Sequence, residues 1–319
     1  MEKGKFVISL DFELHWGVAE LWDVKERKDY FDNTRISIPT VLSLFEKYKI
    51  HATWATVGFL FARNKAQLLQ FSPQLRPTYD KNELSYYRFI DSGEVGADEN
   101  DDPYHYAPSL IEKIIKTPGQ ELATHTFAHY YCNESGQNGK QFEADIKAAQ
   151  SIAKANFGVE LQSLVFPRNQ FNEIYTDIAG KNGIKVVRSN PDVWFWKNKS
   201  RFMALARAAD TFFSISKTLT FKIDKKLAKA ILLLPASRFL RPFTQKERML
   251  QPLKISRIKK EMEFAAKNNE IYHLWWHPHN FGYSLAENLF YLEDILQHYA
   301  YLNQEYGFQS KSMIEMYDN

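Results

Sequence analysis

The chain has 319 residues, of which 45% are hydrophobic and 25% charged, as in a soluble globular protein; this length suits one α/β barrel with insertions. Its single cysteine, Cys132, excludes an internal disulfide and a thiolate-rich metal site. No apolar stretch approaches the ~20 residues needed to cross a bilayer, which excludes a membrane-spanning helix.

The first residues, MEKGKFVISLDFELHWG, enter a β-like run and reach Asp11 before the apolar core of a secretory signal could form. We therefore expect a cytoplasmic protein, located either in solution or at the inner face of the membrane. The aromatic content of 15% suits either a large core or a sugar-binding cleft.

The first predicted strand, KFVISL at 5–10, leads into two acidic residues, Asp11 and Glu13. Alternate side chains of a strand share a face, so these two carboxylates point the same way and Phe12 points the other way. Two carboxylates on one face cost free energy unless they are solvated, paired or bound to a cation. The pair is therefore either a solvated strand end or a metal ligand beside a proton acceptor.

Helical and β-like segments then alternate. A helix over 38–48 precedes a strand over 51–60, and residues 72–108 form a long excursion with turns. A helix over 141–158 has apolar positions at helical spacing and ends at a glycine. We find no internal repeat and no low-complexity tract.

Two histidines follow the β-like run ELATH, with His125 at its end and His129 four residues later. This spacing places both side chains on one helical face, whether or not a metal is bound. A well-known zinc-binding helix motif has the same spacing with glutamate as its base, but Thr126 occupies that position here. The histidines are either metal ligands, with a base from elsewhere, or aromatic side chains inside a tight turn.

Three later β-like runs also end in polar residues. They are LQSLVFPRN, which contains Arg168; IKVVRSNPD, which ends at Asp192; and EIYHLWWHPH, which contains His277 and His279. Polar residues at the carboxyl ends of successive strands mark the active face of a (β/α) barrel. The sequence therefore predicts such a barrel with one convergent site.

A basic segment separates the last two of these runs. Residues 197–260 contain seventeen Lys or Arg and three acidic residues, a net charge of +14, so the rest of the chain carries −11. This asymmetry indicates a local partner surface and not nucleic-acid binding. Basic residues interleaved with Phe, Leu and Ile suit a helix on an anionic membrane, although a solvated lid or an oligomer contact fits the same pattern.

Five motifs occur in the order found in the polysaccharide deacetylase (NodB-homology, carbohydrate esterase 4) family, which this chain resembles as a divergent member. They are SLDFEL, GQELATHTFAHYY, LVFPRNQ, NPDVW and WWHPHN, between residues 6 and about 282. The resemblance implies a distorted (β/α) barrel that removes acetyl groups from sugars with a divalent metal, Zn²⁺ above all. We expect a single domain over 1–319, with a basic helical insertion at about 200–255.

The resemblance also implies roles for individual residues. Asp11 corresponds to the catalytic base, and the metal ligands are Glu13, His125 and His129. The family usually has two adjacent aspartates where this chain has Asp11-Phe12-Glu13, so Glu13 is the departure. Its assignment agrees with the strand alternation, because Phe12 cannot serve as a ligand.

Further roles follow from the other motifs. Arg168 would orient the base, and His277 would act as the general acid, with His279 as a substitute or a cleft residue. Asp192 would tether the acid histidine. Two further residues would contact substrate: Trp194, as a wall of the acyl pocket, and His15.

The expected substrate is an acetylated saccharide, either free or lipid-linked, of cell-surface polysaccharide or lipopolysaccharide synthesis. Two alternatives use the same barrel. One is a deformylase or a hydrolase of cyclic amides, and the other is a non-catalytic saccharide-binding protein. Metal content and acetate release discriminate among the three.

Overall fold

The computed structural model describes residues 2–191, 193–196, 201–213, 215–223 and 231–318. The strands among them are β1 (Lys5–Phe12), β2 (Ala52–Thr56), β3 (Gln120–Thr124), β4 (Ser163–Leu164), β5 (Val186–Ser189), β6 (Leu232–Pro235), β7 (Arg238–Phe239), β8 (Ile271–Trp276) and β9 (Gln309–Lys311). The α-helices are α1 (Lys28–Lys47), α2 (Lys65–Phe71), α3 (Tyr87–Asp91), α4 (Pro108–Lys116), α5 (Gly139–Phe157), α6 (Glu173–Lys181), α7 (Arg201–Phe212), α8 (Gln251–Asn268), α9 (Leu285–Tyr306) and α10 (Glu315–Asp318).

All the paired strands run parallel, in the order β6-β5-β4-β3-β2-β1-β8-β7, and β9 pairs with the start of β1. Parallel strands need crossover connections, which α1, α4, α5, α6 and α8 supply or contribute to. The carboxyl ends of the strands consequently lie at one end of the sheet, where parallel α/β folds place their sites.

The chain between β6 and β7 joins the two edges of this sheet. β6 pairs with β5, and β7, only two residues further on, pairs with β8. At the junction the amide of Ala236 donates to the carbonyl of Ser189, and the amide of Ser237 donates to the carbonyl of His273. One bent stretch of chain thus closes the curled sheet into a distorted barrel.

Strand alternation sorts the side chains between the inside and the outside of this barrel. On β1, Phe6, Ile8 and Leu10 belong to the large core that the strands share with the helices. Val7, in contrast, belongs to a second apolar cluster with one residue from each neighbouring strand, such as Ala55 and Ile271. Because side chains alternate along a strand, Ser9, Asp11 and Glu13 lie on the same inner face as Val7.

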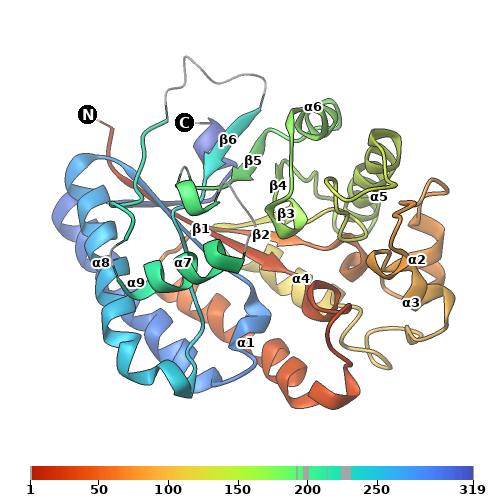
Figure 1. Ribbon diagram of the computed structural model, residues 1–319, viewed down its shortest axis with the longest axis horizontal. Coiled ribbons are helices and arrows are strands. Elements are labelled where there is room, and N and C mark those ends of the chain that lie inside the picture. Colours follow the sequence, from red (N-terminus) through yellow and green to blue (C-terminus); the bar gives the residue numbers. More distant parts are fainter. Residues whose placement is uncertain (1, 192, 197–200, 214, 224–230, 319) are drawn as a thin grey trace.

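Helices enclose the outside of the barrel (Figure 1). α1, α8 and α9 gather on one side of the strands, and α5 and α6 lie on another. α5 shows why the sequence prediction succeeded there: Asn138 and Gln141 form a capping box at its start, and Gly158 ends it in the left-handed conformation. The predicted barrel is confirmed, and strand β2 lies within its predicted range of 51–60, whereas helix α1 begins at Lys28, ten residues before the predicted start at 38.

The prediction of a helical insertion at about 200–255 is only partly correct. α7 is helical, but β6 and β7 lie within the same range and supply the strand that closes the barrel. The runs LLLP and RF hydrogen-bond to β5 and β8, and this long-range pairing overrides the local helical pattern. The basic segment is therefore partly structural.

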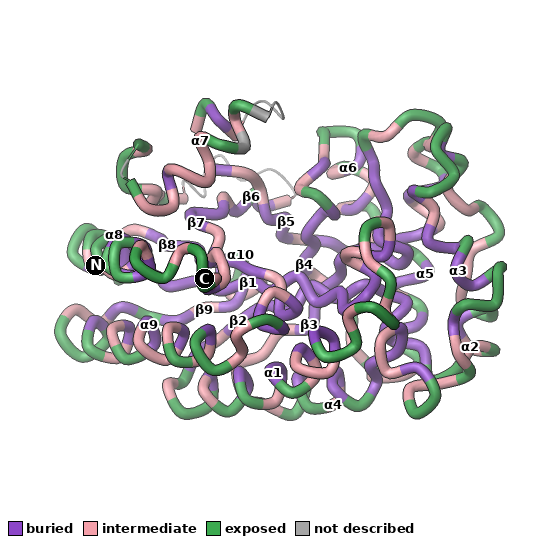
Figure 2. The backbone as a smooth tube through the Cα atoms, turned by 60° about the horizontal axis from the view of Figure 1, so that its bottom comes forward, coloured by how far each residue is buried: buried purple, intermediate pink, exposed green. Residues whose placement is uncertain are grey.

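α7 lies at one edge of the molecule, where its residues are mostly intermediate or exposed, whereas the strands are buried (Figure 2). Across the described ranges, none of the helices combines the length and the apolar character that crossing a bilayer requires.

Candidate active site

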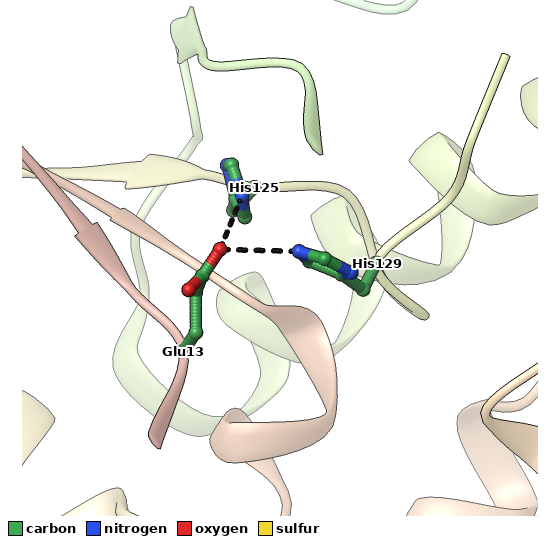
Figure 3. Close-up of side chains that lie close together, drawn as sticks. All are labelled: Glu13, His125 and His129. Carbon is green, nitrogen blue, oxygen red and sulfur yellow. Dashed lines mark hydrogen bonds and ion pairs between the residues drawn. The ribbon is translucent and has the colours of Figure 1, made fainter. Parts of the chain in front are cut away.

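Three side chains converge at the carboxyl end of the barrel (Figure 3). Glu13 follows β1, His125 follows β3, and His129 lies further along the same loop. Oε1 of Glu13 is 2.9 Å from Nε2 of His125 and 3.1 Å from Nε2 of His129, and all three side chains are buried. Their ligand atoms lie within 4.8 Å of one another. Two imidazoles and one carboxylate form a donor set typical of Zn²⁺.

The two histidines lie on a tight loop and not on a helix. Thr126 and His129 both have positive φ, at 65° and 54°, which turns the chain back toward β1. The Thr126 hydroxyl accepts a hydrogen bond from the amide of Tyr130 at 2.7 Å. The Asp145 carboxylate, from α5, accepts from the amides of Phe127 and Ala128 at 2.6 and 3.0 Å. Thr126 thus stabilises the turn, and this turn brings His129 to His125.

Glu13 is positioned by a sharp change of direction after β1. Leu14 has φ of 48°, and a short 3₁₀ helix, Leu14–Gly17, follows. The carboxylate of Glu13 occupies the space that a side chain at position 17 would need, because a Cβ there would lie 1.9 Å from Oε2. Gly17 is therefore required by close packing against the ligand.

The charges of the site suit a cation. Burial alone would raise the pKa of Glu13, but His277, His125 and His129 hold it well below its usual value. Burial lowers the pKa of His129, so its neutral form is favoured. Nε2 of His125 lies near Glu13 without a hydrogen bond, and neither of its ring nitrogens has such a partner among the described residues. A divalent cation among these three atoms would satisfy that buried nitrogen.

A second layer of contacts orients His129. Its Nδ1 is 3.0 Å from the hydroxyl of Tyr131, which donates to Glu20 at 2.6 Å. Since that hydroxyl is used as a donor to Glu20, Nδ1–H of His129 donates to its oxygen and Nε2 keeps a lone pair for a metal. Arg168 pairs with the same Glu20 and lies 4.1 Å from the Tyr131 ring.

Asp11 is held by a different arginine, Arg188 of β5. The guanidinium donates from Nη1 to Oδ1 at 2.6 Å and from Nη2 to Oδ2 at 2.7 Å, and both side chains are buried. Burial would raise the pKa of Asp11, but the charge of Arg188 outweighs that effect and lowers it. Asp11 therefore remains an ionised proton acceptor beside Glu13.

A buried network fixes Arg188 in turn. Its Nη1 also donates to the hydroxyl of Ser9 at 3.1 Å, and its Nη2 to Oδ1 of Asn169 at 3.1 Å. The hydroxyl of Ser9 is 2.8 Å from Nε2 of His273, whose Nδ1 donates to the carbonyl of Pro235. Burial lowers the pKa of His273 to about 3, so this histidine is neutral and accepts from Ser9.

His277 and His279 complete the site from the loop after β8. Nε2 of His277 is 3.6 Å from Oδ2 of Asp11 and 3.9 Å from Oε2 of Glu13. Nδ1 of His279 is 3.5 Å from the same Glu13 oxygen, and its ring stacks on His277 at 5.0 Å. Burial, with the adjacent His277, lowers the pKa of His279 to about 3. His277 is partly exposed, so it is the better placed of the two to exchange a proton.

Other predicted residues lie elsewhere. Arg168, which we expect to orient the base, has a left-handed backbone at φ 54°, and its side chain pairs with Glu20, whereas Arg188 pairs with Asp11. His15 lies between His105, at 2.7 Å, and the carbonyl of Trp22, at 2.8 Å. These contacts place its ring nitrogens away from the ligand set.

Trp194 is exposed over 54% of its surface and packs against Phe195, so it faces the edge of a different cavity from the one that reaches His277. Asp192 lies outside the described residues. Sequence reasoning missed Arg188, although a lone charge at the end of the apolar run IKVV was a usable signal.

The chain matches the model of one protein family, described as polysaccharide deacetylase, over residues 30–187. This range contains His125 and His129, which lie together with Glu13 in the buried site. The chain belongs to the polysaccharide deacetylase family. Asp11 and Glu13 precede the matched range, and His277 follows it.

Solved structures confirm the fold of this deacetylase family member. A polysaccharide deacetylase-type protein from Mycobacterium smegmatis has a TM-score of 0.58 and 10% identity, over 100% of this chain and 90% of that one. An allantoinase, PuuE, has a TM-score of 0.56 and 10% identity, over 98% of this chain and 87% of that one. A 4-α-glucanotransferase from Thermococcus litoralis has a TM-score of 0.58 and 11% identity, over 100% of this chain and 40% of that one. The search of curated protein sequences returned no match.

The space beside Glu13 gives a test of the metal centre. In Gly17→Ala the new methyl group would displace the Glu13 carboxylate, so we expect zinc affinity to fall about tenfold or more. Isothermal titration of the metal-stripped protein with Zn²⁺ measures this change.

Gly180→Ala is the matched control, since its new Cβ would meet only the flexible end of Ile231. Its zinc affinity should equal that of the unmodified protein. Equal affinities for all three proteins would exclude Glu13 from the metal centre.

Proposed function

We propose that this protein is a zinc-dependent hydrolase that removes an acetyl group from the nitrogen of an amino sugar. The observation that carries the proposal is the convergence in one buried site of a ligand set, Glu13 with two histidines, and an ionised Asp11. A bound Zn²⁺ would supply water of lowered pKa, near ~7, and a Lewis acid for the acetyl carbonyl.

Asp11 is arranged to accept the proton of the attacking water. Arg188 binds both carboxylate oxygens, so the side chain cannot rotate away, and its charge keeps the carboxylate ionised. Each oxygen keeps a further lone pair, and Oδ2 faces His277 at 3.6 Å. The acceptor and the ligand Glu13 are two residues apart on one strand face, which divides proton transfer from metal binding.

His277 is arranged to donate a proton to the departing nitrogen. Its Nε2 lies within 4 Å of both carboxylates, so the ring faces the same space as the proposed base and the metal ligands. Phe239 and Trp275 pack against the ring, with centroids 5.9 and 5.7 Å away, and hold it toward the site. Release of the amine then leaves acetate as the other product.

The first test separates metal binding from proton transfer. Asp11→Asn should bind one equivalent of zinc yet lose turnover by about 100-fold or more, because the amide cannot accept the proton. His125→Ala should lose both zinc and turnover. Acetate release from N-acetylated amino sugars and zinc content by mass spectrometry measure the two properties. Full turnover by a zinc-loaded Asp11→Asn protein would refute the assignment of the base.

The two arginines give a second test. Arg188→Met should lower kcat by about 100-fold or more while zinc affinity is kept, because it frees the base. Arg168→Met should instead weaken zinc binding about tenfold, through Glu20, and regain its kcat in excess zinc. Circular dichroism establishes that both variants are folded. The opposite result, with kcat dependent on Arg168 alone, would restore Arg168 as the orienting residue.

We further propose that the protein works in the cytoplasm, at an anionic membrane surface, on a lipid-linked saccharide of cell-surface polymer synthesis. A reducing compartment suits a chain whose single cysteine, Cys132, allows no internal disulfide. Exposed apolar side chains cluster on α7 and just after it: Phe202, Leu205, Phe213 and Ile215. Lys217 and Lys222 are exposed beside them, in the segment of net charge +14. Exposed apolar residues among basic ones suit an anionic lipid surface.

Vesicle flotation tests this surface. The double variant Phe202→Ser, Leu205→Ser should reduce binding to vesicles with anionic lipid about tenfold or more, while Phe290→Ser, an equally exposed phenylalanine on α9, should change nothing. Binding that is unchanged in the double variant, or equal on neutral vesicles, would refute the proposal.

A further inference from the structure

A cavity of about 270 Å³ adjoins His277 on the side of the basic segment. Its walls come from α7, through Ala208 and Thr211, and from the strands that close the barrel, through Phe239 of β7 and Trp275 of β8. His277 belongs both to this cavity and to the site around Asp11 and Glu13. A group bound in the cavity therefore lies next to the proposed proton donor.

The wall of this cavity near His277 is aromatic. The ring of Trp275 is 4.8 Å from that of Phe239 and 6.5 Å from that of Trp196, measured between centroids. The rings of Phe239 and Trp275 also contact His277, at 5.9 and 5.7 Å. These aromatic side chains form a surface that leads from Trp196 to the imidazole. Such a surface suits the C–H faces of a sugar ring, which are apolar although the ring carries hydroxyl groups.

Trp275 also carries a polar group that no protein atom satisfies. The residue is 6% exposed, and its Nε1–H has no hydrogen-bond partner among the described residues. A buried donor without a partner costs about 1–3 kcal/mol, and such donors are rare in folded proteins. The guanidinium group of Arg188 covers one face of this indole, 4.2 Å from the ring centroid. A ligand oxygen that reached this nitrogen would satisfy the donor.

We propose that this cavity binds the pyranose ring that carries the reacting nitrogen, an assignment that rests on the proposed deacetylase function. The leaving nitrogen stays attached to its sugar, so the ring must lie beside the group that protonates it, His277. The volume is below that of typical pockets for drug-sized ligands, so the cavity holds one ring and not an oligosaccharide. The substrate class is therefore a single or terminal N-acetylated amino sugar.

Binding and turnover are measured separately. The probes are N-acetylglucosamine, N-acetylgalactosamine and N-acetylmannosamine, titrated into metal-stripped protein and followed by tryptophan fluorescence. At least one of them should bind, and its trisaccharide, where one exists, should bind within about threefold as tightly. Trp196→Ala and Phe239→Ala should each weaken binding about tenfold or more and raise KM equally. The kcat should change less than about threefold in Trp196→Ala, but it should fall in Phe239→Ala because Phe239 packs against His277. Unchanged zinc affinity shows that the metal centre of each variant is intact.

Phe290→Ala, on the remote α9, is the control and should leave binding and KM unchanged. Trp194→Ala decides between neighbouring tryptophans, since Trp194 borders another cavity. The proposal is overturned if none of the three sugars binds, if a trisaccharide binds far more tightly than its monosaccharide, or if Trp194→Ala raises KM while Trp196→Ala does not.

The outcomes also separate this proposal from the function on which it rests. Sugar binding that depends on Trp196, without acetate release by the zinc-loaded protein, would refute the deacetylase function and support the subsite. Acetate release with an unchanged KM in both Trp196→Ala and Phe239→Ala would refute the subsite and support the deacetylase function.

Discussion

The burial of two carboxylates inside the barrel is the constraint on which the rest of the site depends. Asp11 and Glu13 are both nearly inaccessible to solvent, and an uncompensated buried charge costs several kcal/mol. The chain compensates them differently. Asp11 receives the two N–H groups of Arg188, whereas Glu13 faces His125 and His129. One carboxylate is thereby kept as an ionised proton acceptor, and the other is kept available to a cation.

The barrel makes this compensation possible because it places alternate residues of several strands in one interior. An apolar cluster that includes Val7, Ala55 and Ala123 fills the lower interior. Above it the same strand faces continue as His273, Ser9 and Arg188. Ser9 hydrogen-bonds to both His273 and Arg188, and Arg188 also donates to Asp11. The interior thus changes from apolar to polar toward the carboxyl ends of the strands. A polar layer of this kind is stable only when its members satisfy one another.

The segment that closes the barrel also shapes its surroundings. β6 and β7 link β5 to β8, so the strand that carries Arg188 and the strand that leads to His277 are held by one stretch of chain. α7 is tied to this stretch through Asp210, which pairs with Arg238 and Arg257 at 3.2 and 3.1 Å. The helix consequently bounds the cavity beside His277 while it presents apolar side chains to the outside. Substrate recognition and surface attachment would share one element.

Local pattern was sufficient for part of this site. The period of two along β1 places Asp11 and Glu13 on one face, and the order of motifs identifies His125, His129 and His277 as the residues to bring together. The alternation of strands and helices predicted the barrel, because hydrophobic periodicity and helix caps are local properties of the chain.

Tertiary structure alone decided which groups meet across the barrel. Arg168 and Arg188 are equally plausible partners of Asp11 in sequence, but strand alternation on β5 directs Arg188 inward while a left-handed turn sends Arg168 to Glu20. The loop of His129 depends on Asp145 from a distant helix, and β6 and β7 depend on pairing with β5 and β8. The sequence of a strand determines which way each of its side chains faces. Which side chain on another strand it meets depends on the strand order and on how the whole sheet closes.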